Sequence, residues 1–516
     1  MNETTHRRRW AILAVLCLSL LMVVIDNTIV NVALPTLSED LDASISELQW
    51  VVDAYTLVFA ALLLAFGHFG DRFGRKLALQ LGLVLFAATS LLAAFATTSG
   101  QLIGARALMG VGAAFIFPAT LAILVTVFTD RRERATAIGI WSACTGLAVA
   151  LGPVTGGYLL EHFSWGSIFL VNLPVAAIAL GLGAVLVPTS RDPQSGPMDH
   201  LGLVLSAAGV GLLVWAIIEA PHRGWTSAPI AVAGTTGLVM LAAFAVWERR
   251  NAHPLLDVTL FRNLRFTAAS LSVTTAFFAL FGFIFLITQY LQLVQGYSPL
   301  EAGLRTLPFA VATGVTSPLA MVAVRRFGTK SVVATGLAVM ALGFVMASRV
   351  DVDTPYLGLT VSSMVTMAVG LGLTTGPATE SIMGALPPAK AGVGSAVNDT
   401  TRELGGTLGV AVVGSVFASV YGAAVLDALG NLGLPDEVLA TVQESVAAGL
   451  GVAGTLPADV APAVAAAAQA AFVDGLSAGS LVAAAVAFAG AIVALALLPA
   501  RAAHPAEARP TALVPS

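Results

Sequence analysis

The sequence contains few charged residues. Only 10% of its 516 residues are Asp, Glu, Lys or Arg, whereas 57% are hydrophobic and the mean hydropathy is +0.89. Soluble globular chains carry about a quarter charged residues, so this composition excludes a soluble domain and indicates a polytopic protein embedded in the lipid bilayer. It also gives no reason to expect a nucleic-acid partner.

Cysteine and the common ligand motifs are equally scarce. The two cysteines, Cys17 and Cys144, both lie in apolar segments, which favours small buried side chains over a disulfide or a metal site. The seven histidines lack the spacing of metal ligands, and no GxxxxGK[ST] nucleotide-binding motif occurs. We therefore expect no metal, no cofactor, no ATP-driven pump and no enzyme.

Long apolar runs dominate the remaining sequence. A run of about 20 residues crosses a ~30 Å hydrocarbon core as a helix, and Arg7 to Arg9 precede a first run without a clear cleavage site, so we expect an uncleaved first span. The prediction is an all-α polytopic membrane protein with 14 transmembrane helices. The predicted spans are 11–35, 48–69, 77–97, 101–125, 135–160, 166–188, 201–219, 228–247, 266–292, 303–323, 330–348, 356–380, 393–423 and 477–499.

The basic residues predict the orientation of these spans. With this helix count, 20 of the 25 Lys and Arg residues fall on one side of the membrane, which places both termini in the cytoplasm. Segment 424–476 lies on the other side and contains acidic residues but no Lys or Arg. Its Gly and Pro residues argue against a further span and predict short amphipathic helices at the surface.

Two loops at equivalent positions indicate an internal repeat. "GDRFGRK" (70–76) and "VRRFGTK" (324–330) share Arg, Phe, Gly and Lys, and each follows the second helix of its half. We infer two six-helix bundles related by an axis along the membrane normal, with two helices inserted between them. The predicted domains are an N-terminal bundle at 1–190, the inserted helices and linkers at 191–262, a C-terminal bundle at 263–500 that includes the extracellular loop 424–476, and a cytoplasmic tail at 501–516.

Several segments resemble a known family. "GHFGDRFGRK" (67–76), "LIGARALMGVGAA" (102–114) and "GPVTGG" (152–157) resemble motifs of the major facilitator superfamily. Its fourteen-helix drug:H+ antiporter branch, the QacA/EmrB-like proteins, is resembled by four more segments: "IDNTIVNVALP" (25–35), "VVDAYTL" (51–57), "YLQLVQGYSPLEAGLRTLP" (290–308) and "GVGSAVNDTTRELGGTLGVA" (392–411).

This resemblance implies a proton-coupled multidrug efflux antiporter that exports amphiphilic, cationic compounds by alternating access. The alternatives are a dedicated exporter of one antibiotic, metabolite or lipid and, from a different class, a structural or sensory membrane protein. The implied partners are a small-molecule amphiphilic substrate, protons and the lipid bilayer of the cytoplasmic (inner) membrane. We expect a monomer.

Three ionisable residues are predicted to share one layer of the membrane. Asp26 follows Trp10 by about 16 residues and so lies roughly 24 Å from the cytoplasmic end, while Asp53 and Arg106 lie near the outer ends of their spans. A carboxylate in hydrocarbon usually faces a cavity or an opposite charge. Asp26 and Asp53 are therefore candidate proton or cation sites with Arg106 as their charge partner, and the alternative is a static network between helices.

A second acidic pair lies in the C-terminal half. Asp399 and Glu403 are four residues apart and so share one face of a helix. They are candidates for proton coupling or cation binding. The alternative is that Arg402 neutralises Asp399 within the helix.

The remaining motifs carry mechanical roles. For the GPVTGG motif, the resemblance implies a hinge that seals against proton leak, and the alternative is simple helix packing; its members are Gly152, Pro153, Gly156 and Gly157. The loop motif is a candidate conformational latch, in which glycines permit a tight turn and charges break and re-form contacts. The latch residues are Gly67, Gly70, Asp71, Arg72, Gly74, Arg75 and Lys76.

Aromatic residues within the spans are candidates for a substrate cavity, because aromatic rings stack on flat or cationic molecules. The alternative for each ring is packing against neighbouring helices or lipid. The candidates are Phe115, Phe117, Trp141, Phe281 and Tyr290.

Overall fold

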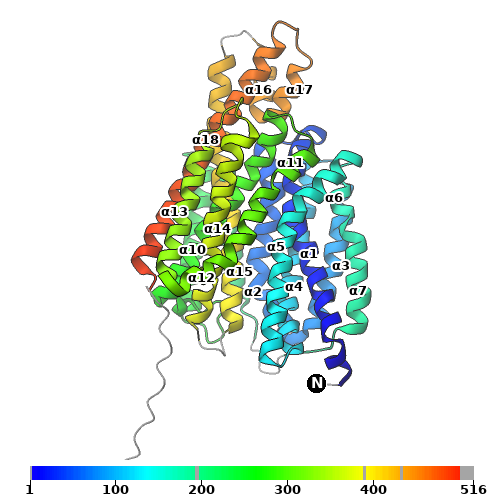
Figure 1. Cartoon of the computed structure of the whole chain (residues 1–516). Helices are drawn as coiled ribbons and strands as arrows, with labels where there is room; N and C mark the ends of the chain where they lie inside the picture. The colour runs from blue at the N-terminus through cyan, green and yellow to red at the C-terminus, as the bar shows by residue number, and fades with distance from the viewer. Residues whose placement is uncertain (1–2, 192–196, 387–390, 431–433, 500–516) are drawn as a thin grey trace, which may run out of the picture.

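The computed structural model describes residues 3–191, 197–386, 391–430 and 434–499 as a bundle of long helices (Figure 1). The N-terminal half contains α1 (Glu3–Asp40), α2 (Ile45–Phe73), α3 (Arg75–Ala94), α4 (Ser99–Val127), α5 (Arg131–His162), α6 (Ser167–Leu170) and α7 (Asn172–Leu186). The inserted helices are α8 (His200–Arg223) and α9 (Ala228–Glu248). The C-terminal half contains η1 (Val258–Arg262), α10 (Leu264–Gln289), η2 (Tyr290–Val294), α11 (Pro299–Arg305), α12 (Leu307–Phe327), α13 (Thr329–Ala347), η3 (Tyr356–Thr360), α14 (Val361–Gly384), α15 (Ala391–Leu429), α16 (Asp436–Glu444), α17 (Val446–Ala453) and α18 (Ala461–Leu497).

The helix count agrees with the sequence. Within the described residues, 13 helical segments are long and apolar enough to cross a membrane. Helix α5 has 32 residues and is therefore about 48 Å long, which makes it the remaining spanning helix. The all-α prediction with fourteen helices is confirmed.

The end of the C-terminal half differs from the prediction. Helix α18 begins at Ala461, well before the predicted start at 477, and α15 continues to Leu429, so only α16 and α17 are short helices. Pro462 had argued against a helix, but it occupies the first turn, where the missing N–H removes no helical hydrogen bond. Val464 and Phe472 then anchor this extension by complete burial.

The two loop motifs form equivalent turns. Gly74 joins α2 to α3 with φ of +127°, and Gly328 joins α12 to α13 with φ of +82°. L side chains rarely adopt this region, which explains the glycine in both copies. The backbone therefore supports the repeat inferred from the sequence.

The inserted helices pack against both halves. Helix α8 contacts α2 and α15, and Ser415 Oγ donates to the carbonyl oxygen of Ile217 at 2.7 Å. Asp199 caps α8 and accepts from Trp247 Nε1 at 3.0 Å and Asn251 Nδ2 at 2.7 Å, which ties α8 to the end of α9. Burial raises the pKa of Asp199, but these hydrogen bonds and one from the backbone outweigh it and hold the pKa below its ordinary value.

The bundle has two distinct ends. Figure 1 shows the start of α1 at the lower end, which we call the proximal end, and α16 and α17 at the upper end, which we call the distal end. Hydrogen bonds join the halves toward the distal end: Thr288 Oγ1 donates to the Asn31 carbonyl at 2.7 Å, and Ser38 Oγ lies 2.9 Å from Ser445 Oγ. Since α1 reaches the distal end near Asp40, these contacts close that end.

Candidate functional site

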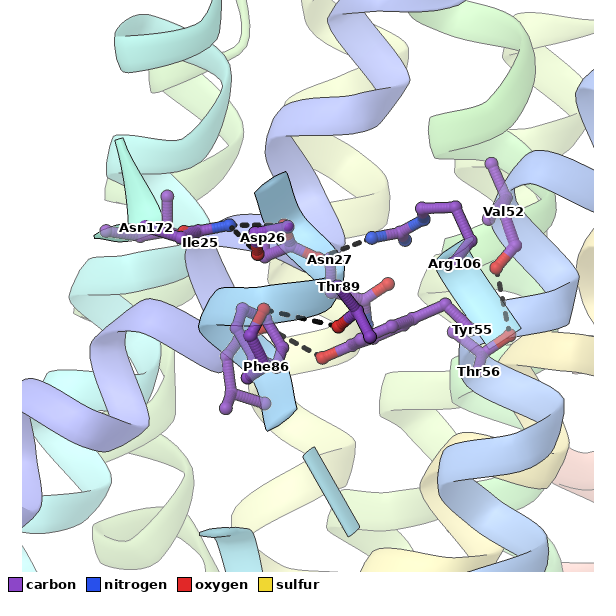
Figure 2. A network of polar contacts seen from close by, with 12 residues as sticks. Ile25, Asp26, Asn27, Val52, Tyr55, Thr56, Phe86, Thr89, Arg106 and Asn172 are labelled. Carbon is purple, nitrogen blue, oxygen red and sulfur yellow. Dashed lines mark hydrogen bonds and ion pairs between the residues drawn. The ribbon is translucent and has the colours of Figure 1, made fainter. Parts of the chain in front are cut away.

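An ion pair occupies the interior of the N-terminal half. Arg106 Nη1 of α4 donates to Asp26 Oδ2 of α1, and both side chains are fully buried. Asn172 of α7 donates from Nδ2 to the other oxygen of Asp26 at 2.8 Å (Figure 2) and to Ser90 Oγ of α3 at 3.2 Å. The carboxylate of Asp26 therefore connects α1 to α4 and α7, and Asn172 extends this network to α3.

The guanidinium of Arg106 is held on further sides. Its Nε donates to the Val51 carbonyl at 3.0 Å, and its Cζ lies 4.3 Å from the ring centroid of Tyr55. The Tyr55 hydroxyl in turn donates to the Val23 carbonyl at 3.1 Å. This cation–π contact and the two hydrogen bonds fix the arginine between α1, α2 and α4.

Asp53 is buried without a charge partner in the described part of the chain. Thr56 Oγ1 lies 3.5 Å from Asp53 Oδ1, and no hydrogen bond reaches Oδ2. We had expected Arg106 to serve both acids of the N-terminal half, but it pairs with Asp26. Asp53 Oδ1 lies next to Thr56, whose hydroxyl in turn contacts Thr407 of the C-terminal half.

A cavity of about 60 Å³ lies between the two halves. Beside it, Thr407 Oγ1 of α15 and Thr56 Oγ1 of α2 are 3.0 Å apart and bridge the halves. The cavity lining includes Asn27, Tyr55, Phe59 and Phe117 from the N-terminal half and Phe277, Phe281, Asp399, Arg402 and Glu403 from the C-terminal half.

The charged wall of this cavity is only partly paired. Arg402 Cζ lies 4.5 Å from the ring centroid of Phe277, and Asp399 Oδ1 accepts from Asn398 at 3.3 Å. Glu403 Oε2 and, on the opposite wall, Asn27 Oδ1 are buried and accept no hydrogen bond from the described residues. The cavity thus presents two free acceptors to whatever enters it.

The aromatic candidates occupy different environments. Phe117 and Phe281 line the cavity. Trp141 packs behind Phe117 with ring centroids 5.4 Å apart, and Phe115 stacks on Phe66 at 3.8 Å. Tyr290 lies farther away, and its hydroxyl donates to the Asp351 carbonyl at 3.0 Å.

Sequence reasoning missed two contributors to the site. Asn172 was overlooked although it is a single amide within the apolar run 166–188, and that isolation was the available signal. Tyr55 was overlooked because an aromatic residue in a membrane helix usually only packs.

The latch residues bind one another and the neighbouring helices of the N-terminal half. Arg75 Nε forms an ion pair with Asp71 Oδ1 at 2.8 Å, and its guanidinium also donates to Thr126 Oγ1 of α4. Lys76 Nζ donates to the Ala184 carbonyl of α7 at 2.7 Å. Gly67 packs against Pro118, Gly70 against Ala78, and Arg72 lies over Phe73.

The GPVTGG motif lies where α5 meets α1 and α11. A Cβ on Gly156 would approach Ile29 Cγ1 to 2.7 Å, and one on Gly157 would approach the Pro299 carbonyl oxygen to 2.5 Å. Gly152 faces Thr28 in the same way. Gly152 and Gly156 therefore permit close packing of α5 on α1 within the N-terminal half, and Gly157 permits backbone contact with α11 of the C-terminal half.

Two six-helix halves around a central cavity with buried charges define the class of polytopic membrane transporters. The chain belongs to the Major Facilitator Superfamily, whose family model matches residues 16–410. It is 41% identical to the "Multidrug efflux pump LfrA" of Mycolicibacterium smegmatis over 95% of this chain and 96% of that protein. It is 35% identical to the "Methyl viologen resistance protein SmvA" of Salmonella typhimurium over 90% and 93%.

Solved structures support the fold. A bacterial homologue of the human lysosomal transporter Spinster superposes with a TM-score of 0.67 at 19% identity, covering 97% of this chain and 99% of that chain. A D-xylose–proton symporter superposes with a TM-score of 0.61 at 15% identity over 95% and 98%.

Proposed function

We propose that this protein is a proton-coupled multidrug efflux antiporter that exports amphiphilic, cationic compounds by alternating access. The observation that carries the proposal is the central cavity, where aromatic rings line the same space as Asp399 and Glu403 and where Glu403 Oε2 has no hydrogen-bond partner among the described residues. An unpaired carboxyl in a water-poor cavity binds either a proton or a cation. Exchange between the two is the chemistry of an antiporter, and the substrate itself is not converted.

The names of the relatives support a drug as the substrate. The proteins at 41% and 35% identity carry the descriptions "Multidrug efflux pump" and "Methyl viologen resistance protein". A second candidate is a dedicated exporter of one antibiotic, because a "Tetracenomycin C resistance and export protein" of Streptomyces glaucescens is 31% identical over 95% of this chain.

Each group of residues has a role in the proposed cycle. Glu403, Asp399 and Asp53 load and release protons or cations, while the buried Asp26–Arg106 pair keeps the N-terminal bundle rigid. Gly157 of the GPVTGG motif opens and closes the distal contact with α11, and the loop of Asp71 and Arg75 stabilises one of the two states at the proximal end.

The transport experiment uses purified protein in liposomes with an imposed pH gradient. We expect uptake of organic cations such as methyl viologen, abolished by a protonophore. Glu403→Gln should reduce gradient-driven transport by about tenfold or more, because a proton site is lost. Glu380→Gln, an exposed acid of α14, is the matched control and should transport normally. A transport rate that is the same with and without the pH gradient would contradict proton coupling.

In the proposed orientation, both termini lie on the cytoplasmic side of the bacterial inner membrane. The proposed transport unit is a monomer. A cysteine introduced at Gly451, which has open space around it, should react with an impermeant thiol reagent in intact cells. A cysteine at Phe73, 53% exposed at the proximal end, should react only after permeabilisation. The reverse pattern would overturn the orientation.

A further inference from the structure

Two acidic residues meet at the base of the inserted helices, away from the central cavity. Asp199 directly precedes α8 and Glu248 ends α9, and the two residues are only 8% and 3% exposed. A Cβ on Gly202 would lie 2.4 Å from Glu248 Oε1 and 2.5 Å from Asp199 Oδ2, so both oxygens lie close to one point. The glycine therefore leaves room for direct contact between the two carboxyl groups.

The hydrogen-bond donors around the Asp199–Glu248 pair are divided unequally. Asp199 accepts from one backbone N–H and two side chains, with the shortest distance, 2.7 Å, to Asn251 Nδ2. Glu248 Oε2 accepts from the Leu256 N–H at 3.0 Å, whereas Oε1, on the side of Asp199, has no partner among the described residues. Because hydrogen bonds to a carboxylate favour its charged form, Asp199 is the charged member of the pair.

A single proton on Glu248 completes this arrangement. A protonated carboxyl group is a donor, so Glu248 donates to Asp199 only when it carries a proton. Without that proton, two like charges share one buried position and repel each other. Within the described ranges, no group of three or more His, Cys, Asp or Glu residues could hold a metal ion. A proton is therefore the ligand that the chemistry of the pair favours.

The surrounding charged residues do not neutralise the pair. Asp199 is the charged group that acts on Glu248, and none of the ion pairs found in the described part of the chain includes either acid. Asp257 of the linker caps η1 instead. The other titratable residues beside the pair are exposed, and they are His200, Arg249, Arg250 and His253.

The Asp199–Glu248 pair connects three segments at the proximal end. Asp199 caps α8, Glu248 ends α9, and the Leu256 N–H belongs to the linker that leads to η1 and α10 of the C-terminal half. The segment before α8 lies beside the loop motif of the N-terminal half, because the Arg75 N–H donates to the Ser190 carbonyl at 2.9 Å. The pair therefore lies on the side that the proposed orientation makes cytoplasmic.

We propose that Asp199 and Glu248 form a proton-binding site, separate from the transport cavity, that attaches the linker to the inserted helices when the proton is bound. When the proton leaves, repulsion separates the two carboxylates, and the Leu256 N–H loses its acceptor. Low pH thus favours the attached state, and rising pH favours release.

The position of α8 gives this attachment a consequence for transport. Helix α8 contacts α2 of the N-terminal half and α15 of the C-terminal half, so its attachment at the base restrains movement of one half against the other. This step rests on the proposed efflux function. Proton entry during export acidifies the cytoplasm, the site becomes protonated, and transport slows before further protons enter.

The test measures hydrogen–deuterium exchange around Leu256 in the purified full-length protein between about pH 5.5 and 8.5, above the ordinary range of a glutamate. Chemical exchange itself varies with pH, so each wild-type rate is divided by the rate of Glu248→Gln at the same pH. Glutamine stays neutral and mimics the protonated acid. The ratio should be near one at the lower pH and rise to about tenfold or more at the higher pH.

Two further variants make this measurement specific. Glu219→Gln is the matched control, because its ion pair with Arg223 lies at the other end of α8, and it should show the wild-type rise. Asp199→Asn keeps a residue that caps helices well and removes the second charge, so the rise should disappear. Melting temperatures verify that the variants are folded.

Three results would overturn the proton site. The first is a wild-type ratio that stays near one at every pH, and the second is an undiminished rise in Asp199→Asn. The third is protection around Leu256 that sodium or calcium ions restore at about pH 8.5, because the occupant would then be a metal ion.

A transport measurement distinguishes this proposal from efflux itself. The pH difference across the liposome is held constant while both pH values are lowered from about 8 to about 6, and wild-type methyl viologen transport should slow by about threefold or more relative to Glu248→Gln. The same pH dependence in both proteins would overturn the regulatory role and leave efflux intact. Loss of gradient-driven transport in both would contradict efflux, while the exchange ratio would still decide the proton site.

Discussion

The two halves of the molecule treat their buried charges differently. In the N-terminal half, both oxygens of Asp26 have donors, Arg106 and Asn172, and both partners of the ion pair are fully buried. In the C-terminal half, Arg402 lies against a phenylalanine ring, and Glu403 Oε2 has no partner among the described residues. One half holds a closed network and the other an open one.

This difference separates structure from transport. A buried ion pair resists change, because removal of either partner leaves an uncompensated charge in a low dielectric. An unpaired carboxylate beside a cavity is instead stabilised by a proton or cation that it binds. We therefore expect mutations in the closed network to affect stability first, and mutations in the open one to affect transport first.

The largest expected effect is on stability. Arg106→Ala should destabilise the protein by about 3–5 kcal/mol, because Asp26 loses its buried partner. Arg402→Ala, the matched change in the other half, should cost about 0.5–2 kcal/mol, since it removes mainly a cation–π contact. Thermal unfolding of the two purified variants measures the contrast, and equal melting temperatures would end the distinction between the halves.

Asp53 tests what decides whether mutation of a buried acid affects stability or transport. The deciding factor is either the pairing of the acid or the half of the molecule in which it lies. Asp53 lies in the N-terminal half, but its Oδ2 has no hydrogen-bond partner in the described part of the chain, so Asp53→Asn should act like a change in the open network. We expect a near-normal melting temperature and gradient-driven transport reduced by about tenfold or more. Asp26→Asn is the comparison and should lose stability. A destabilised Asp53→Asn protein that retains coupling would assign Asp53 to the structural network.

The contact between the halves can be weakened sterically. In Gly157→Ala the new methyl would meet the Pro299 carbonyl oxygen at 2.5 Å, so closure of the distal end should become less favourable. Disulfide cross-linking of a Ser38→Cys/Ser445→Cys pair, whose hydroxyls lie 2.9 Å apart, reports this closure. The cross-linking yield should fall by about fivefold or more, because roughly 1–3 kcal/mol of steric strain disfavours the closed state. Gly139→Ala in the same helix meets no atom within 4 Å and should leave the yield unchanged.

The smallest expected effect concerns the threonine bridge. Thr407→Val removes the hydrogen bond to Thr56 between the halves, which is worth about 0.5–1.5 kcal/mol. The same cross-linking yield should change by roughly twofold to tenfold. Thr401→Val removes only a bond to the Asn398 carbonyl within α15 and is the control. No difference between the two variants would show that the bridge does not bias the conformational equilibrium.

Much of the architecture followed from local sequence. Apolar length predicted the fourteen helices, and the two copies of the loop motif predicted the repeat, because both features depend on short segments. The sequence predicts a loop where α18 begins at Ala461, and this prediction is wrong. Proline is tolerated in the first turn of a helix, and the sequence alone does not show that Pro462 occupies that turn.

The sequence by itself thus determined the class of protein, the helix count and the candidate acids, because hydrophobic length and isolated charges are properties of single segments. Only the tertiary structure decided which acid has a partner. Asp26 and Asp53 lie at similar predicted depths, yet among the described residues Arg106 and Asn172 donate to the first and only Thr56 to the second. The central cavity likewise lies between helices of both halves, and no single segment encodes such a space.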